Sequence, residues 1–501
     1  MKLSEIIKGT GAGILHGLAD TEILSITCDS RQAGPGCAFI AVKGTSADGH
    51  DYIPQALENG AAAVIDADRR ALALCADRFY SHPSGKLKLV GITGTNGKTT
   101  TVTLLYNLFR NLGYECGLLS TIANYVGSRR LETQNTTADP ITINSLLAQM
   151  VDEGCEYCFM EVSSIGLEQD RVTGLEFKLG IFSNLTHDHL DYHGTFAEYL
   201  RCKKLFFDNL DKKAVAIINT DDRNGSVMVQ NTAARVVSYS CRTVADHCCR
   251  IMEESFEGML LKIDGTEVWT RLIGRHNAYN ILAIYCAAVE LGCGKTEALT
   301  AISRLESARG RLENIPGPDG INVIIDYAHT PDALENVLST LRDVAPERTL
   351  ICVFGCGGDR DKTKRPEMAA IAERLSDRIF VTSDNSRTES TEDIIEDIKK
   401  GFSPAGLAKC ICIPDRKEAI NAAIRLCPGN STILLAGKGH ETYQIRQGRR
   451  DHFSEKEVIA EWLAAKDDAE GSKTAGAKLL AACKDGIDVD LTGTQWEAEW
   501  L

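Results

Sequence analysis

The chain has 501 residues, 44% of them hydrophobic and 25% charged, values that exclude a disordered chain, a collagen-like chain and a small disulfide-stapled scaffold. The formal charge of −14 disfavours nonspecific binding to nucleic acid. No apolar run of about 18 residues and no signal-peptide pattern occur, so we expect a cytoplasmic protein without a membrane partner.

The first 86 residues predict a small α/β domain. Residues 37–44 form an apolar run typical of a strand, and residues 51–65 predict a helix that leads into a strand. Residues 81–86 are rich in turn formers and predict a linker.

A second α/β domain is expected at residues 87–312. The apolar strand KLKLVGIT leads through the glycine loop GTNGK into the amphipathic helix TTTVTLLYNLFRNLG, the order of elements that opens a nucleotide-binding domain. A helix is expected at 277–291, and strands precede it at 158–164, 178–185, 214–220 and in a turn-bounded region at 235–273.

A third domain is expected at residues 313–466, after a Gly- and Pro-rich boundary at 307–320. Ligands bind at the carboxyl ends of the strands in a doubly wound sheet, so the loops after these strands should line one crevice. Residues 467–501 predict either a short helix and strand or a loose appendage. The four apolar strands that predict the sheet are 321–330, 349–358, 377–386 and 431–440.

Cysteine is frequent, with 18 residues scattered along the chain. Without a secretory signal we expect reduced, buried thiols rather than disulfides. Cys155 and Cys158 form the only C-x-x-C, and no second pair stands at zinc spacing, so we assign them no metal or redox role.

A phosphate-binding loop is predicted before the first helix of the second domain. We expect Lys98 to reach the β- and γ-phosphates and Thr99 to hold Mg²⁺, while backbone N–H groups and the helix dipole face the phosphates. Ile92 stands where the usual G-x-x-x-x-G-K-[ST] pattern has its first Gly; a plain strand–helix turn is the alternative. The loop residues are Gly94, Thr95, Asn96, Gly97, Lys98, Thr99 and Thr100.

Two further segments are candidates for metal binding. Glu161 ends the next strand, where a carboxylate either holds Mg²⁺ or merely caps the strand. Residues 187–193 contain three His, but no spacing supports zinc. Oxygen-rich surroundings favour Mg²⁺ with an assisting His, and a solvated polar loop is the alternative.

Four loops of the third domain carry the remaining chemistry. Glycine-rich loops with Arg or Lys suit carboxylates and phosphates, and Arg can bind them bidentately. One such loop alone is an ordinary connection, whereas four at successive strand ends indicate a shared site. The loops are 326–331, 355–360, 384–387 and 437–441.

These motifs together resemble the ATP-dependent Mur ligases of peptidoglycan synthesis. The resemblance covers about residues 20–463 and is carried by GITGTNGKTT, EVSS, NLTHDHLDYHG, DYAHTPDALE, GCGGDRDKTKRPEM and GKGHE. It implies an α/β fold of three domains: a small UDP-binding domain at 1–86, a central P-loop ATPase domain with a parallel sheet at 87–312, and a C-terminal Rossmann-like domain at 313–466 that binds an amino acid.

The resemblance implies an ATP-dependent ligase that activates a carboxylate as an acyl phosphate, which an amine then attacks. Its implied cofactors are ATP and Mg²⁺, and one lysine is implied to be an N6-carboxylysine; of the neighbours Lys203 and Lys204, the family pattern favours Lys203. The implied catalytic residues are Lys98, Glu161, His189 and Lys203, and the implied metal ligands are Thr99, Glu161, His189 and Lys203. Further implied ATP contacts are Asn277, Arg311, Asp326 and His329.

The implied substrates are a UDP-muramoyl-dipeptide and a diamino acid. Ile165 stands where the family usually has His, so any role of that His is lost or replaced. The implied dipeptide contacts are Ser30, Asn135, Thr136, Thr137, Ser164, Gln169 and Arg171.

The amino acid added is expected to be meso-2,6-diaminopimelate. Arg387 keeps the guanidinium that can grip its second carboxylate, although Ser386 replaces the family's Pro and loosens the loop. Pairing of Arg387 with Glu389 on the surface is the alternative. The implied contacts are Arg360, Asp384, Asn385, Arg387, Gly437 and Glu441.

Three other functions remain open. One is the same ligase acting on L-lysine or another diamino acid. A folylpolyglutamate synthetase would share the phosphate loop but not the DNSR and GKGHE loops, and a non-catalytic nucleotide-binding homologue would lose the metal ligands. We expect a monomer with small-molecule substrates and no nucleic acid.

Overall fold

The structure is a computed structural model that describes residues 1–501 except 45–46, 134, 187–189, 308 and 471–501. The chain divides into two compact units. The first unit consists of Met1–Arg250, Lys262–Val268 and Ala278–Leu305, and the second of Ile251–Leu261, Trp269–Asn277 and the described residues from Glu306 onward.

The first unit begins with a four-stranded sheet. Its elements are α1 (Leu3–Ile7), β1 (Gly13–His16), β2 (Ser25–Thr27), β3 (Cys37–Ala41), α2 (Ile53–Glu58), β4 (Ala63–Asp66) and α3 (Arg69–Phe79). The strand order is β1-β4-β3-β2, with β1 antiparallel to its neighbour and the others parallel. The strand expected within 37–44 and the helix-then-strand expected within 51–65 are confirmed.

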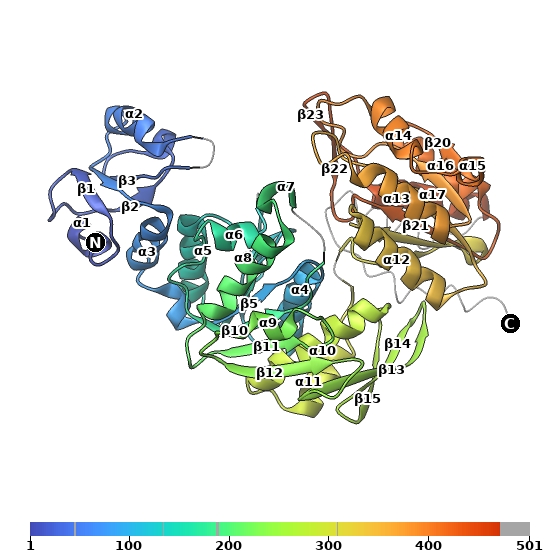
Figure 1. Ribbon diagram of the computed structural model, residues 1–501, viewed down its shortest axis with the longest axis horizontal. Coiled ribbons are helices and arrows are strands. Elements are labelled where there is room, and N and C mark those ends of the chain that lie inside the picture. The colour runs from blue at the N-terminus through green and yellow to red at the C-terminus, as the bar shows by residue number, and fades with distance from the viewer. Residues whose placement is uncertain (45–46, 134, 187–189, 308, 471–501) are drawn as a thin grey trace. The chain divides into compact units, whose positions relative to one another are not determined.

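The middle of the chain forms an eleven-stranded sheet, in the order β15-β14-β13-β12-β11-β10-β5-β9-β6-β7-β8 (Figure 1). Its elements are β5 (Lys88–Thr93), α4 (Lys98–Asn111), β6 (Cys116–Leu119), β7 (Asn124–Val126), β8 (Arg129–Leu131), α5 (Pro140–Asp152), β9 (Tyr157–Glu161), α6 (Ser164–Glu168), β10 (Phe177–Phe182), α7 (Leu190–His193), α8 (Phe196–Asp208), β11 (Val215–Asn219), α9 (Gly225–Met228), β12 (Arg235–Ser240), β13 (His247–Ser255), β14 (Gly258–Ile263), β15 (Thr266–Thr270), α10 (Arg275–Glu290) and α11 (Lys295–Ile302). The strands from β12 to β6 pair in parallel, as the sequence predicts.

Helix α4 forms where the sequence expects it because its apolar residues recur at helical spacing. Leu105, Leu108 and Phe109 are fully buried, and α4 packs on β6 and β9. The ring of Phe109 lies 4.5 Å from that of Tyr157 and 5.2 Å from that of Phe159, measured between centroids. This packing fixes the helix whose N-terminus follows the phosphate loop.

The second unit is built on a six-stranded sheet in the order β16-β17-β21-β18-β19-β20, with a separate β22-β23 hairpin. Its elements are β16 (Glu313–Pro316), β17 (Asn322–Asp326), α12 (Pro331–Val344), β18 (Thr349–Phe354), α13 (Lys364–Leu375), β19 (Arg378–Val381), α14 (Thr391–Lys399), α15 (Pro404–Ala408), β20 (Cys410–Cys412), α16 (Arg416–Leu426), β21 (Ser431–Ala436), β22 (Tyr443–Arg446), β23 (Arg449–His452) and α17 (Glu455–Glu470). The five strands from β17 to β20 are parallel, and β16 pairs antiparallel with β17.

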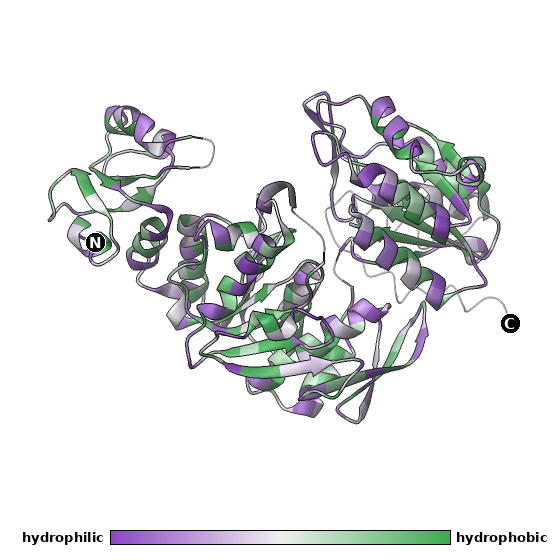
Figure 2. Ribbon diagram, viewed as in Figure 1, coloured by the Kyte–Doolittle hydropathy of each residue, from purple (hydrophilic) through white to green (hydrophobic). Residues whose placement is uncertain are grey.

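Helices cover both faces of this second sheet, because successive side chains of a strand point to opposite faces. Leu434 of β21 joins a core with α12, α13 and α14, whereas Ile433 and Leu435 join a core with α16 and α17. In Figure 2 the strands are mostly green, and the helices mix green with purple. The doubly wound sheet expected in the third domain is therefore confirmed.

The second unit contains four strands that were not predicted from the sequence: the edge strands β16 and β20 and the two strands of the β22-β23 hairpin. The stretch 307–320, expected only as a boundary, contains the edge strand β16, which ends at Pro316; an edge is where a sheet tolerates proline. The short edge strand β20 and the β22-β23 hairpin were not predicted. The domain boundaries 1–86, 87–312 and 313–466 stay a prediction.

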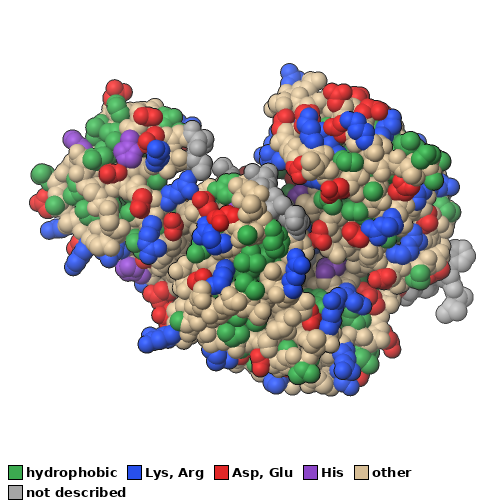
Figure 3. Space-filling view, in the orientation of Figure 1, with side chains coloured by type: hydrophobic (Ala, Val, Ile, Leu, Met, Phe, Trp, Pro, Cys, Tyr) green, Lys and Arg blue, Asp and Glu red, His purple; other side chains and the backbone are tan. Residues whose placement is uncertain are grey.

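Positive and negative side chains are interspersed over the face that Figure 3 displays, so the net charge is not gathered in one place there. Every cysteine in the described part of the chain is a free thiol, Cys155 and Cys158 included. None of the described helices combines the length and the apolar character needed to cross a bilayer.

Candidate active site

The loop between β5 and α4 owes its shape to two glycines. Gly97 has φ 88° and ψ −9° and caps α4 at its N-terminus, and Gly94 has φ 152°. A side chain on Gly94 would place its Cβ 2.0 Å from the hydroxyl of Ser183, and one on Gly97 would lie 2.6 Å from Asn280 Oδ1. Only glycine fits either position, so the turn is built for close backbone approach.

The end of β10 holds this loop in place. The backbone N–H of Asn96 donates to Asn184 Oδ1 at 2.9 Å, and the carbonyl of Asn96 accepts from Ser183 Oγ at 2.7 Å. Thr95 Oγ1 accepts the N–H of Thr186 at 3.0 Å. The loop is therefore fixed before any ligand binds.

Two lysines converge on one oxygen of the loop. Lys98 Nζ donates to the carbonyls of Gly94 and Thr95, at 2.9 and 2.8 Å, and Lys203 Nζ donates to the same Gly94 carbonyl at 2.8 Å. Lys203 is 1% exposed, and its ammonium lies 4.7 Å from the ring centroid of Tyr199. Lys204 instead forms an ion pair with Asp208 on the same helix.

Glu161 at the end of β9 is a candidate cation ligand. Its side chain is fully buried, and Oε1 accepts the backbone N–H of Thr121 at 2.8 Å. Its Oε2 has no hydrogen-bond partner among the described residues. A buried carboxylate oxygen without a partner carries a desolvation penalty that a bound cation would remove, so Glu161 fits a Mg²⁺ site. His189, another of the implied ligands, lies outside the described residues.

The residues expected to meet the dipeptide substrate lie beside Glu161. Thr137 Oγ1 donates to the carbonyl of Glu161 at 2.9 Å, and Arg171 donates to the carbonyl of Thr137 at 2.6 Å. Arg171 also holds Gln169 Oε1 at 2.7 Å, and the hydroxyl of Thr136 accepts from Thr121 at 3.0 Å. Most of the predicted set therefore forms one connected cluster.

The other three residues of this set have partners elsewhere. Ser164 Oγ lies 2.9 Å from Nε2 of His193 in α7, and Ser30 Oγ donates to Gln55 at 2.6 Å in the N-terminal sheet. Asn135 accepts a hydrogen bond from Thr133 through its carbonyl. Ile165 is half-buried in α6, so the imidazole that contacts Ser164 comes from His193.

The predicted ATP contacts outside the phosphate loop belong to the second unit. Leu312 N–H donates to Asp326 at 2.7 Å, and burial raises the pKa of Asp326 against the opposing effect of Arg311. Arg311 stacks 5.0 Å from the ring centroid of Tyr327, and its Nε is buried with no hydrogen-bond partner among the described residues. Asn277 donates to the Ile273 carbonyl at 2.8 Å. The Arg311 donor is available to an anionic ligand.

Hydrogen bonds and close packing join the four loops of the second sheet. His329 lies 2.8 Å from the carbonyl of Tyr327 and accepts Lys364 through its own carbonyl, while the rings of Tyr327 and His440 are 5.1 Å apart. The N–H of Gly358 donates to the Asn385 carbonyl at 2.9 Å. The prediction that these loops lie together is confirmed.

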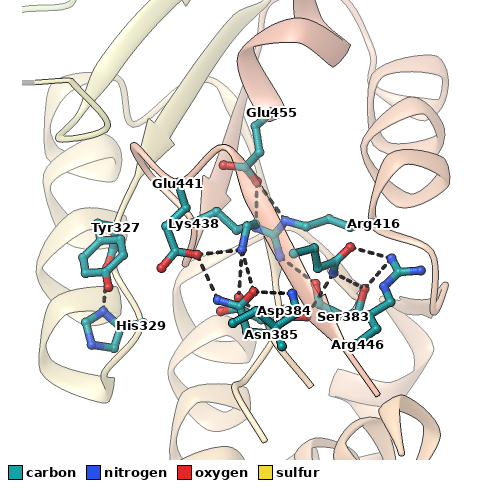
Figure 4. A network of polar contacts seen from close by, with 12 residues as sticks. Tyr327, His329, Ser383, Asp384, Asn385, Arg416, Lys438, Glu441, Arg446 and Glu455 are labelled. Atoms are coloured by element: carbon teal, nitrogen blue, oxygen red, sulfur yellow. Dashed lines mark hydrogen bonds and ion pairs between the residues drawn. The ribbon is translucent and has the colours of Figure 1, made fainter. Parts of the chain in front are cut away.

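Lys438 is the centre of a polar network in this loop cluster (Figure 4). Its side chain is fully buried, and Nζ lies 2.7 Å from Glu441 Oε2, 3.2 Å from Asn385 Oδ1 and 3.5 Å from Asp384 Oδ1. Burial raises the pKa of Asp384, but Lys438 and Arg416 outweigh this effect and hold that pKa below its usual value. A side chain on Gly437, which has φ 119°, would approach Asp384 Oδ2 to 3.1 Å.

Arg387 presents one side of its guanidinium to the outside of this network. Its NH1 donates to the carbonyls of Gly358 and Asn385, at 2.7 and 3.3 Å. Its Nε and NH2 make no hydrogen bond with a described residue. Glu389, the alternative partner considered from the sequence, pairs instead with Arg365 and Lys362.

Three family models match successive segments of the chain, and all three describe Mur ligase domains. Residues 22–85 match the Mur ligase family catalytic domain, residues 92–288 the Mur ligase middle domain and residues 310–439 the Mur ligase glutamate ligase domain. The chain belongs to the Mur ligase family. Its fold is the three-domain α/β fold of that family.

Individual relatives of this Mur ligase are similar over nearly its whole length. The UDP-N-acetylmuramoyl-L-alanyl-D-glutamate--2,6-diaminopimelate ligase of Phocaeicola vulgatus is 48% identical over 482 residues, which cover 93% of this chain and 100% of the relative. A solved structure of an enzyme with that same name is 29% identical, has a TM-score of 0.68, and covers 94% of this chain and 100% of its own.

The folylpolyglutamate synthetase alternative shares the fold alone. A solved folylpolyglutamate synthase from Mycobacterium tuberculosis is 17% identical, with a TM-score of 0.60, over 72% of this chain and 91% of its own. The two enzyme types therefore share an architecture.

Sequence reasoning missed several residues of the Mur ligase loop cluster. Lys438 entered the sequence analysis only within the GKGHE motif, because the sequence alone does not distinguish a buried lysine from one on the surface. Gln444 donates to Ser383 Oγ at 2.8 Å and to the Asp384 carbonyl at 2.9 Å. Gln447 and Gly448, both with positive φ, form the tight turn of the β22-β23 hairpin. This glycine-containing turn is the sequence feature from which the hairpin that carries Gln444 could have been predicted.

Arg416 was also missed. It connects the ends of β19 and β21, the two strands that lead into the loops 384–387 and 437–441. Its guanidinium is fully buried; it donates to the carbonyls of Ser383 and Ala436 at 3.1 and 2.8 Å and to Glu455 at 2.9 Å. Removing one partner of a buried ion pair typically costs about 3–5 kcal/mol. We therefore expect Arg416→Ala to lower the midpoint of thermal unfolding by about 10 °C, measured by circular dichroism.

Lys417 supplies the matched control for this prediction. It pairs with Glu461 between the same two helices, but both side chains are about half exposed, and such pairs contribute about 1 kcal/mol or less. Lys417→Ala should change the midpoint by less than about 3 °C. Equal shifts for the two variants would contradict the role assigned to Arg416.

Proposed function

We propose that this Mur ligase adds meso-2,6-diaminopimelate to UDP-N-acetylmuramoyl-L-alanyl-D-glutamate, with ATP activating the dipeptide carboxylate as an acyl phosphate. Curated relatives of that name share 46–48% of their residues with the chain over more than nine tenths of its length. The observation that carries the proposal is the open side of the Arg387 guanidinium within the loop cluster of the second unit.

The phosphate loop supports the ATP-dependent step. Lys98 Nζ already contacts the loop carbonyls, and its charge would stabilise the phosphoryl group as the dipeptide carboxylate attacks it. Arg311, whose buried Nε has no hydrogen-bond partner among the described residues, supplies a further donor for the nucleotide. Mg²⁺ bound at this site would neutralise charge on the phosphates.

We propose Thr99, Glu161, His189 and a carbamylated Lys203 as the residues that hold Mg²⁺. Two observations support this assignment: Glu161 Oε2 has no hydrogen-bond partner among the described residues, and Thr99 is buried in the first turn of α4. An uncarbamylated Lys203 would present a cation to the metal, whereas a carbamate presents anionic oxygens, which Mg²⁺ prefers.

The dipeptide site is proposed around Thr136, Thr137, Gln169 and Arg171. The Arg171 guanidinium is partly buried, and burial lowers its pKa, yet it stays charged because the pKa of Arg is far above neutrality. A fixed positive group, joined to Glu161 through Thr137, suits a substrate that carries carboxylates. Ser30, Asn135 and Ser164 complete the proposed contacts.

The amino-acid site follows from the chemistry of diaminopimelate. This molecule differs from L-lysine by one carboxylate at the far end of its side chain, so a selective site needs a cation there. Nε and NH2 of Arg387 form the side of a guanidinium that binds a carboxylate bidentately. Asp384, Asn385 and Glu441 offer acceptors for ammonium groups, Gly437 a backbone contact, and the exposed Arg360 a second cation.

Phosphate release from ATP tests the proposed function directly. With the UDP-linked dipeptide present, meso-2,6-diaminopimelate should drive release of phosphate and L-lysine should not. Equal release with L-lysine would overturn the substrate assignment, and release with a folate substrate alone would overturn the reaction class. ATP and a UDP-linked substrate are cytoplasmic metabolites, so we propose a cytoplasmic enzyme, and we propose that it acts as a monomer.

Arg387→Ala should raise the Michaelis constant for diaminopimelate by roughly ten- to a hundredfold, because a hydrogen bond to a charged group contributes about 1.5–3 kcal/mol. The Michaelis constant for ATP should stay unchanged in the same assay. Arg374→Ala, which removes a half-exposed guanidinium paired with Glu335, is the control. An unchanged constant for diaminopimelate in Arg387→Ala would refute this role.

A further inference from the structure

Two cysteines stand side by side on the edge strand of the second sheet. Cys410 and Cys412 are the first and last residues of β20, the outermost strand beside β19. Residues two apart in a strand point to the same face, and the two Sγ atoms lie 3.9 Å apart. Cys412 is exposed and Cys410 half-buried.

The surroundings of this pair favour a thiolate on the exposed sulfur. A hydrogen bond with Cys410 holds the pKa of Cys412 below its usual value, and the ammonium of Lys399 acts in the same direction, against burial and Glu396. The same contact raises the pKa of Cys410. Cys412 is also the more exposed of the two sulfurs, so a disulfide in solution reaches it first, with Cys410 beside it.

We propose that Cys410 and Cys412 form a thiol–disulfide exchange site for low-molecular-weight disulfides. The thiolate of Cys412 attacks one sulfur of a disulfide RS–SR, the S–S bond breaks, and RS⁻ leaves. The Cys410 thiol then loses its proton and attacks the Cys412 sulfur of the mixed disulfide, and the second RS⁻ leaves. Overall, two protein thiols and RS–SR become one Cys410–Cys412 disulfide and two RSH.

The strand geometry makes this exchange reversible. Residues two apart in an extended strand have Cα atoms about 6.6 Å apart, near the upper limit of about 6.8 Å for a disulfide. Closing the bond therefore pulls β20 away from its extended form, and strained disulfides are the more readily reduced ones. The pair suits a transient disulfide rather than a structural one.

Oxidised glutathione serves as the probe for this site. The full-length, reduced protein is exposed to it at neutral pH, quenched with acid and analysed by peptide mass spectrometry. In the unaltered protein the peptide with Cys410 and Cys412 should lose two hydrogens. Cys410→Ser should instead accumulate a glutathione adduct on Cys412, because the resolving thiol is gone, and Cys412→Ser should show neither product.

Two matched controls make the outcome decisive. Cys28 is the other exposed cysteine of the described residues, but burial raises the pKa of its thiol to about 12, so it should react more slowly than Cys412. Cys28→Ser should react as the unaltered protein does. Lys399→Ala should slow the reaction about two- to fivefold, the effect of one exposed charge, whereas Lys400→Ala, which removes a neighbouring lysine paired with Asp397, should not. Adduct formation at Cys28 equal to that at Cys412, or no adduct in Cys410→Ser, would overturn the proposal.

Discussion

Replacing Lys98 with alanine is expected to reduce ligase activity by about a hundred- to a thousandfold or more, the scale seen when one charge-stabilising donor is removed. Lys98 Nζ lies on the carbonyls of Gly94 and Thr95, inside a loop that the end of β10 holds rigid. A charge positioned in this way acts on the phosphoryl group during its transfer. Phosphate release with ATP, the UDP-linked dipeptide and diaminopimelate all saturating measures the effect.

The matched control for Lys98→Ala is Lys178→Ala. Lys178 is the exposed residue of β10, whose other residues are all buried, so its ammonium lies in the same domain but away from the loop. Its loss should leave turnover unchanged. Near-normal turnover in Lys98→Ala would refute the assignment of the phosphate loop.

Lys203→Ala is expected to be inactive and to recover part of its activity when small carboxylic acids are added. The expected loss follows from burial: Lys203 is 1% exposed and reaches the Gly94 carbonyl, so its modified form would place a carboxylate beside the phosphate loop. A small carboxylate that diffuses into the vacated space would replace those oxygens. Ligase activity at increasing formate or acetate concentrations measures the recovery.

Lys204→Ala supplies the control, because neighbours on a helix point about 100° apart. Lys204 pairs with Asp208 of the same helix rather than with the loop, so this variant should stay active. The carboxylic acid should have no effect on it. Inactive Lys204→Ala together with active Lys203→Ala would transfer the modification to Lys204.

The phosphate loop and the order of domains could be predicted because their signals are local. Gly94 and Gly97 stand in a strand–loop–helix sequence whose backbone only glycine can adopt, and the apolar periodicity of α4 needs no distant partner. The choice of Lys203 over Lys204 rests on a family pattern and stays a prediction; Lys203 is the more deeply buried of the two. The convergence of four loops followed from a general property of parallel sheets.

The contacts inside the loop cluster could not be predicted, because they depend on residues far apart in the sequence. Lys438 meets Asp384 and Asn385 across more than fifty residues of chain, and Arg416 meets Glu455 across 39. The surface pair of Arg387 with Glu389 was plausible by spacing alone. It does not form, because Arg365 approaches Glu389 from α13.

The Gly94 carbonyl accepts hydrogen bonds from two ammonium groups, and this crowding of charge bears on the proposed reaction of Lys203 with CO₂. Lys98 and Lys203 bring like charges to one oxygen, and like charges repel each other. Addition of dissolved CO₂ to Lys203, the reaction that forms the proposed carbamate, turns its charge from positive to negative and the repulsion into attraction. If Lys203 carries the proposed carbamate, the occupied fraction of that site depends on the concentration of dissolved CO₂.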